Sequence, residues 1–248
     1  MRLTVLGCSG TFPGPQSGCS SYLVEADGFR LMVDAGNNAI GTLQSFCDLL
    51  DVDAVLLSHL HADHCIDLVA YAYARRYHPL GMQPTLPLYG PVGTRQRLVS
   101  CFDHPPVDGL RETYDFRTVT PGRLEVGPFT VDLARVAHPI EAYGVRLTAG
   151  GRTLTYSGDT GPCEDLVALA RGSDAFLCEA SWHDDVANPP GVHMSGREAA
   201  EHADRAGVDR LLLTHLVPWS DPQRTMNEAT ASFGGDIALV RSGERYDI

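Results

Sequence analysis

The stretch Ser58-His59-Leu60-His61-Ala62-Asp63-His64 decides the fold, and it directly follows the apolar run Ala54-Val55-Leu56-Leu57. Because that run is apolar on both faces, it predicts a strand buried within a parallel sheet. Open α/β sheets place their ligand sites at the carboxyl ends of such strands. Three imidazoles and one carboxylate within six residues are ligands that zinc, manganese and iron accept. We therefore predict a metal site here rather than four unrelated polar side chains.

Length and composition are those of an ordinary globular protein. The chain has 248 residues, of which 44% are hydrophobic and 20% charged, so we expect residues 1–248 to form a single domain. No apolar run approaches the roughly 20 residues that span a bilayer, and the N-terminal segment is too short for a signal-peptide core. The seven cysteines are scattered and include no C-x-x-C pair, which predicts reduced thiols and a cytoplasmic location.

The charge balance restricts the substrates. All 19 basic residues are arginine, and the formal net charge is −12. An acidic protein without a basic tract is poorly suited to hold a long polyanion by neutralising its phosphates, so long nucleic acids are disfavoured as partners. A small anionic substrate remains compatible, because metal ions can create a local positive site inside an acidic surface.

Strand and helix patterns alternate along the chain, which predicts the α/β class. Ser195 and Glu198 match a capping box, which predicts a helix start. We expect strands at 3–6, 21–25, 29–33, 54–57, 86–89, 129–136, 145–148, 153–156, 175–178, 211–213 and about 237–241. We expect helices at 39–50, 67–77, 93–102, 164–171 and 195–206, and a Pro/Gly-rich loop at 103–113.

One internal similarity suggests two related halves. The segment 52–60 parallels the segment 208–216, and each combines a buried strand with a histidine at the same offset, His59 and His215. We therefore expect two α/β halves whose strand ends face each other across a shared site.

Several further polar side chains fall at predicted strand ends, as this cluster does. The set comprises His59, His61, Asp63, His64, His138, Asp159 and His215, with Glu179 and His193 in similar positions. Seven ligands are too many for one tetrahedral ion, but they suit two ions that share a bridging carboxylate.

These motifs resemble those of the metallo-β-lactamase fold superfamily, in the same order and over nearly the whole chain. The matching features are His-x-His-x-Asp-His at 59–64, a later histidine, the aspartate of Ser-Gly-Asp-Thr at 157–160, and a final histidine. The resemblance implies a four-layer αβ/βα sandwich with two divalent ions, zinc in first place and manganese or iron as alternatives. It implies one ion held by His59, His61 and His138, a second held by Asp63, His64 and His215, Asp159 bridging them, and Asp34 supporting the metal loops.

Within the superfamily, the chain looks most like the RNase Z-like phosphodiesterases. That branch has a glutamate and a histidine at the positions of Glu179 and His193, which the resemblance implicates, with Asp63, in delivering a proton to the leaving oxygen. Alternative roles are a salt-bridge partner for Glu179 and a capping or buried hydrogen-bonding residue for His193.

The absence of a tRNA-binding arm indicates a small substrate. Members of the branch that process tRNA carry a long basic arm between the equivalents of His138 and Asp159, whereas here only residues 139–158 intervene. The segments at 179–182, 193–196 and 214–219 look like those of atypical bacterial cyclic-nucleotide phosphodiesterases. Trp182 and Trp219 are candidates to stack a purine base, with packing as the alternative. Arg75 and Arg76 are candidates to assist electrostatically, with a solvated helix face as the alternative.

The sequence therefore predicts a dinuclear hydrolase of small phosphodiesters, foremost 3',5'-cyclic nucleotides, in which a metal-bound hydroxide attacks phosphorus. The resemblance also implies a homodimer. Alternatives are an RNase Z-type tRNA 3'-processing endonuclease, and a thioesterase, lactonase or aryl-ester hydrolase of the same fold. A third possibility is a binding or regulatory module with an inactive site. The presence of a suitable residue at every ligand position argues against it.

Overall fold

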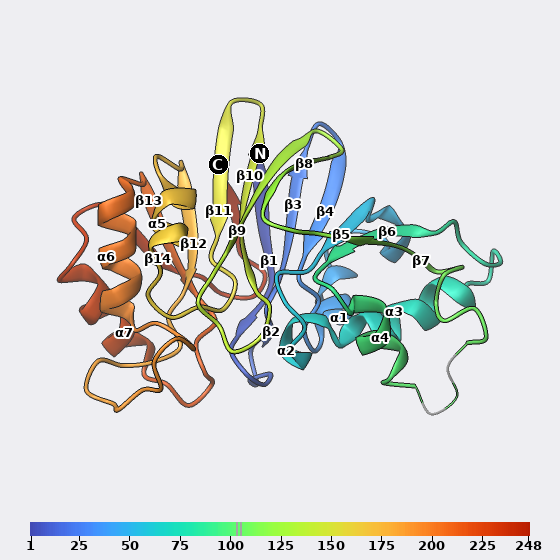
Figure 1. Ribbon diagram of the computed structural model, residues 1–248, viewed down its shortest axis with the longest axis horizontal. Helices are drawn as coiled ribbons and strands as arrows, with labels where there is room; N and C mark the ends of the chain where they lie inside the picture. The colour runs from blue at the N-terminus through green and yellow to red at the C-terminus, as the bar shows by residue number, and fades with distance from the viewer. Residues whose placement is uncertain (103, 105) are drawn as a thin grey trace.

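Two β-sheets packed face to face, with helices on both outer sides, make up the molecule (Figure 1). The computed structural model describes residues 1–102, 104 and 106–248. Asp103 and Pro105, which belong to the predicted loop 103–113, lie outside the described residues. No described helix is both long enough and apolar enough to cross a membrane.

The first sheet contains most of the N-terminal strands. They are β1 (Arg2–Ser9), β2 (Gly18–Cys19), β3 (Ser21–Ala26), β4 (Phe29–Val33), β5 (Ala54–Leu56), β6 (Leu86–Gly90), β7 (Tyr114–Thr118) and the C-terminal β15 (Arg245–Asp247). Their order is β15-β1-β3-β4-β5-β6-β7, with β2 paired to β1. Because β4, β5, β6 and β7 are parallel, their carboxyl ends lie along one edge.

The second sheet repeats this plan. Its strands are β8 (Gly122–Val126), β9 (Phe129–Arg135), β10 (Tyr143–Ala149), β11 (Arg152–Tyr156), β12 (Ala175–Glu179), β13 (Arg210–Thr214) and β14 (Asp236–Leu239). Their order is β14-β13-β12-β11-β10-β9-β8, with β11 to β14 parallel. Each half therefore joins antiparallel strands to a parallel set, as the expectation of two related halves requires.

The helices form the two outer layers. Against the first sheet lie α1 (Ala39–Leu43), the 3₁₀ helix η1 (Leu49–Asp51), α2 (Ala62–Cys65), α3 (Asp67–Arg76) and α4 (Thr94–Val99). Against the second sheet lie α5 (Glu164–Ala170), α6 (Gly196–Ala206) and α7 (Pro222–Thr230). Strand alternation divides the apolar residues among three cores: in β12, Ala175 and Leu177 face the other sheet, whereas Phe176 and Cys178 face the helices. The α/β sandwich fold expected from the sequence is confirmed.

Two tyrosines connect the sheets reciprocally across the central core. Tyr22 of β3 bonds through its hydroxyl to Thr214 Oγ1 of β13, at 2.7 Å. Tyr156 of β11 donates to Asp34 Oδ2, just beyond β4, at 2.9 Å. The two rings also contact each other, with centroids 5.0 Å apart. Each sheet therefore contributes one tyrosine whose hydroxyl contacts a residue in or just beyond a strand of the other sheet, near the predicted metal site.

Two sequence expectations need correction. The helix predicted at 39–50 is wrong in its second part, because α1 ends at Leu43 and Asp48 caps the separate helix η1. The similarity between 52–60 and 208–216 pairs β5 with β13, but strand order makes β5 the counterpart of β12 and β6 the counterpart of β13. The halves are related, although that segment match is not the relation between them.

Candidate metal centre

The predicted ligands lie in loops and short helices that follow strand ends of both halves. His59 and His61 follow β5, while Asp63 and His64 lie in α2. His138, Asp159 and His215 follow β9, β11 and β13, respectively. Because the parallel ends of both sheets meet here, residues far apart in sequence form two adjoining clusters.

The first cluster contains three histidines and one carboxylate. His61 Nδ1 lies 3.2 Å from His59 Nε2 and 3.1 Å from His138 Nε2. Asp159 Oδ2 lies 3.6 Å from His59 Nε2. All four ligand atoms fall within 4.8 Å of one another, as ligands around one ion do.

The second cluster shares Asp159 with the first. Asp159 Oδ1 lies 3.1 Å from His64 Nε2, and Oδ2 lies 3.3 Å from His215 Nε2. Asp63 Oδ2 completes the group, 3.7 Å from His64 Nε2 and 3.8 Å from His215 Nε2. The structure therefore brings together two groups of candidate ligands that share Asp159.

Three buried atoms show that this donor set fits a cation. His64 Nε2, Asp159 Oδ1 and His215 Nε2 have no hydrogen-bond partner among the described residues. Since His64 uses Nδ1 on Asp34, a neutral imidazole directs the lone pair of Nε2 at the carboxylate oxygen of Asp159. Two facing lone pairs in a buried site repel, and a positive charge between them removes the repulsion.

Burial and the neighbouring charges shift the pKa values of the candidate ligand histidines. Burial, reinforced by the charge of His64, lowers the pKa of His59 well below its usual range. Burial also lowers the pKa of His61 and His138, which favours their neutral, ligating form. Burial opposes protonation of His64 as well, but Asp159 and Asp34 outweigh it and raise the His64 pKa well above the ordinary value. Carboxylates that favour a proton at this position also favour a metal cation.

Asp34 supports the first half of the centre, as expected. Its carboxylate accepts hydrogen bonds from Ser58 N and Oγ, from His64 Nδ1 and from Tyr156, at 2.7–2.9 Å. Asp34 and His215 both adopt positive φ, 57° and 60°, which is costly for residues other than glycine. Such strain persists where the surrounding contacts fix the side chain, and both residues lie at this centre.

Other supporting contacts were not predicted from the sequence. Thr11 N donates to Asp63 Oδ2 at 2.8 Å, so the Gly/Pro-rich loop after β1 holds this carboxylate. Ser20 Oγ lies 2.7 Å from His215 Nδ1, and the carbonyl of Val192 lies 3.0 Å from His138 Nδ1. These contacts orient the imidazoles toward the centre, as the outer partners of metal-binding histidines do.

Glu179 and His193 lie beside both clusters. His193 Nδ1 is 2.8 Å from Glu179 Oε1, and the Glu179 carboxylate also accepts from Thr160 N at 2.7 Å. The His193 ring centroid is 5.7 Å from that of His138 and 5.5 Å from that of His215. Burial lowers the pKa of His193, but the charge and hydrogen bond of Glu179 outweigh burial and raise it to about 9. The Glu179 carboxylate therefore favours the protonated form of the imidazole that adjoins the centre.

The remaining candidates divide between the site and the scaffold. Trp182 packs edge-on against His193 at 5.1 Å, whereas Trp219 is 79% exposed and contacts the Phe12 ring at 4.7 Å. Arg75 is buried and donates to Pro84 O, so it lies on no solvated helix face. Arg76 is paired with Asp108 and Glu112, and both arginines therefore have structural roles.

Comparisons with known proteins identify the family. The Beta-lactamase superfamily domain model matches residues 29–216. A Mycobacterium leprae protein is 45% identical over 253 aligned residues, with 100% of this chain and 89% of that protein covered. A ribonuclease Z of Mycobacterium bovis BCG is 30% identical over 280 aligned residues, with 100% and 98% covered.

Among solved structures, the metallo-β-lactamase fold protein YhfI of Bacillus subtilis matches with a TM-score of 0.88 and 28% identity, with 99% of this chain and 98% of YhfI covered. The family match spans both ligand clusters, from β4 to the residue after His215. The chain therefore belongs to the β-lactamase superfamily, as a metallo-hydrolase of its RNase Z-like branch.

Proposed function

We propose that this protein hydrolyses small phosphodiesters and that 3',5'-cyclic nucleotides are its preferred substrates. The observation that carries the proposal is the Glu179–His193 pair, joined at 2.8 Å and adjoining both ligand clusters. Hydrolysis of a diester expels an alkoxide, which needs a proton, whereas esters with stable leaving groups have less use for a dedicated acid. An acid held beside the centre therefore favours the phosphodiester reaction.

The ligand sets divide between two divalent ions. His59, His61 and His138 would hold one, and Asp63, His64 and His215 the other, with Asp159 shared. Ions bound there would supply Lewis acidity and acidify water, with zinc the first candidate and manganese or iron the alternatives.

The protein side chains donate and accept the protons that the reaction transfers. The attacking water loses a proton to the Asp63 carboxylate as its oxygen bonds to phosphorus. The phosphorus–oxygen bond to the leaving group breaks, and the leaving oxygen takes a proton from His193. Because Nδ1 of His193 is engaged by Glu179, Nε2 is the nitrogen that faces the substrate. Asp63, fixed by the amide of Thr11, takes part in proton transfer beside the attacking water.

Two features favour small substrates over tRNA. The hairpin of β10 and β11 uses most of the residues between His138 and Asp159, which leaves no length for a binding arm. The alignment with ribonuclease Z covers 280 residues against the 248 of this chain, so that relative has additional residues. The exposed Trp219, resting on Phe12 next to Thr11, offers a flat apolar surface for a nucleobase.

A substrate panel tests the proposal. Hydrolysis would be measured with cyclic AMP, cyclic GMP, a generic aryl phosphodiester, a tRNA precursor, a thioester and a lactone, each with added Zn²⁺ or Mn²⁺. We expect the cyclic nucleotides to have the highest kcat/KM. Higher kcat/KM on the tRNA precursor would assign the endonuclease function, and higher kcat/KM on the thioester or lactone would assign the ester-hydrolase function.

The proton-delivery role has a separate test. We expect His193→Ala to retain its metal and to lose about 10²–10⁴-fold in kcat on a cyclic nucleotide, with a much smaller loss on an aryl diester whose leaving group needs no proton. His78→Ala is the control, because the one hydrogen bond of the His78 ring within the described part of the chain is accepted from Leu80 N. Equal losses of kcat on the two substrates would refute proton delivery by His193.

A further inference from the structure

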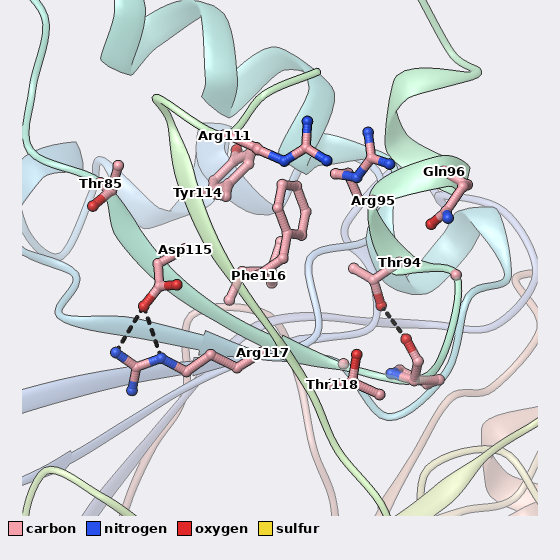
Figure 2. Close-up of a pocket in the computed structure, with 14 residues that line it drawn as sticks. Thr85, Thr94, Arg95, Gln96, Arg111, Tyr114, Asp115, Phe116, Arg117 and Thr118 are labelled. Carbon is pink, nitrogen blue, oxygen red and sulfur yellow. Dashed lines mark hydrogen bonds and ion pairs between the residues drawn. The ribbon is translucent and has the colours of Figure 1, made fainter. Parts of the chain in front are cut away.

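A cavity lies apart from the metal centre, between β6, β7 and α4. Its volume is about 500 Å³, within the range of small-molecule sites, and its lining includes none of the residues of the two ligand clusters. Figure 2 shows the guanidinium groups of Arg95 of α4 and Arg111 of the loop before β7 near each other, with the ring of Phe116 next to them.

The two guanidinium groups converge on one point. A methyl group placed on Gly109 would lie 2.8 Å from Arg95 Nη1 and 3.9 Å from Arg111 Nη1, so both nitrogens lie within 4 Å of the same position. Two like charges near one position repel each other, and an anion placed between them would offset that repulsion.

The nearby carboxylates are already engaged elsewhere. Asp115 pairs with Arg117 at 2.7 Å, while Asp108 and Glu112 pair with Arg76 at 3.2 and 3.6 Å. Among the described residues, no carboxylate pairs with Arg95 or Arg111. In a protein of net charge −12, this pair of arginines is a local exception, and both arginines line the cavity.

We propose that this cavity binds an organic phosphate of about mononucleotide size. Two arginine forks match the oxygens of a phosphate group, which they bind bidentately. The volume exceeds what a phosphate ion needs, and the Phe116 ring offers an apolar face for the organic part of the ligand. This inference does not depend on the proposed phosphodiester hydrolysis.

Calorimetric titration of the metal-loaded protein tests the site, with 5'-AMP, inorganic phosphate and adenosine as probes. We expect one 5'-AMP binding event to weaken at least tenfold in Arg95→Gln/Arg111→Gln, while any binding at the metal centre remains. Inorganic phosphate should bind the same site more weakly than 5'-AMP. Turnover of an aryl phosphodiester should be unchanged in this variant. A loss of 5'-AMP binding at this cavity can therefore be told apart from a failure of the proposed hydrolysis.

The control is Arg2→Gln/Arg123→Gln, which removes the same charge from two exposed surface ion pairs. It should bind 5'-AMP as the unsubstituted protein does. Arg95→Lys/Arg111→Lys keeps the charge and should restore only part of the affinity. Identical 5'-AMP titrations of the Gln pair and the unsubstituted protein would overturn the proposal, as would adenosine binding as tightly as 5'-AMP. An oligoadenylate that bound this site far more tightly than 5'-AMP would replace the small ligand with a nucleic acid.

Discussion

Asp34 connects several parts of the metal centre through hydrogen bonds. Its four hydrogen bonds reach the backbone and hydroxyl of Ser58, the ring of His64, and Tyr156 from the opposite sheet. Its left-handed backbone is one that asparagine also tolerates. Substitution by asparagine therefore changes the carboxylate and leaves the backbone preference largely unaltered.

We expect Asp34→Asn to fold and to lose about 10–100-fold in metal affinity, because the amide cannot accept all the bonds that orient His64. Competition with a chromogenic chelator measures this affinity. Asp53→Asn is the matched control, since Asp53 is exposed and accepts from Arg30 N far from the centre. An unchanged zinc affinity in Asp34→Asn would show that His64 is oriented without this contact.

At the residue scale, the sequence predicts the convergence of side chains that are close together in the chain. His59, His61, Asp63 and His64 lie close together in the chain, so their convergence follows from a strand end and one helical turn. The contacts of Thr11 N with Asp63 and of Ser20 with His215 depend on how distant loops pack, which no local pattern encodes. The Gly/Pro-rich loop at 7–15 is visible in the sequence, but its partner is not.

Among the secondary-structure elements, α4 connects the two sites. Arg97 on this helix donates from Nε to the carbonyl of Leu60, at 3.2 Å, between His59 and His61. We expect Arg97→Gln to lower metal affinity by about 3- to 10-fold, since one hydrogen bond is worth about 0.5–1.5 kcal/mol. Arg95→Gln on the same helix is the control for metal binding, because Arg95 makes no described contact with Leu60. If both variants changed metal affinity equally, the effect would belong to the helix and not to this bond.

A second element-scale contact connects the β10–β11 hairpin to the start of β12. Asp174 accepts from Thr153 N and Oγ1 and from Arg152 Nη1 at 2.6–2.8 Å. Burial raises the pKa of Asp174, but these donors outweigh burial and lower it to about 2. Because the folded pKa lies below the unfolded value of 3.8, the contribution is present at neutral pH and is lost as pH falls from about 4 toward 2.

We expect Asp174→Asn to lower the free energy of unfolding by about 1 kcal/mol at neutral pH, a figure reduced for solvent screening of this partly exposed carboxylate. The difference from the unsubstituted protein should narrow below about pH 4. Urea unfolding at neutral and acidic pH measures both values. A difference that stayed constant with pH would mean that the charge of Asp174 contributes nothing.

The elements that the sequence did not predict have weak patterns. β7 and β8 are edge strands with mostly exposed side chains, so they lack the apolar alternation that reveals a strand. Helix α7 is the exception, since its sequence has a start signal: Asp221 caps the helix and Pro222 is its first residue. The predicted helix 39–50 was overextended because the cap at Asp48 starts a new helix.

For the molecule as a whole, the centre is shared between the halves. His59, His61, Asp63 and His64 come from the first half, and His138, Asp159 and His215 come from the second. Ions bound there would therefore connect the two sheets. The order of the motifs predicts this sharing, whereas the distances depend on the packing of the central core.

We expect a chelator to lower Tm by about 5–11 °C, since one ion at a hundred times its Kd contributes about 2.7 kcal/mol, and 1 kcal/mol corresponds to about 2–4 °C at this chain length. Differential scanning fluorimetry with and without chelator measures the shift. Asp159→Ala should have a lower Tm and little further response to chelator. A full chelator response in that variant would mean that the ions bind without the shared carboxylate.

Because of the reciprocal tyrosine pair, the geometry of the metal centre depends on how the two sheets are aligned. Tyr22 and Tyr156 each reach from one sheet to a residue beside the ligands of the other. Each ligand cluster contains side chains from both halves, so the distances within a cluster depend on the thickness of the central core as well as on the loops that carry the ligands. Substitutions deep in that core, far from any ligand, should alter which metal the protein selects before they alter whether it folds.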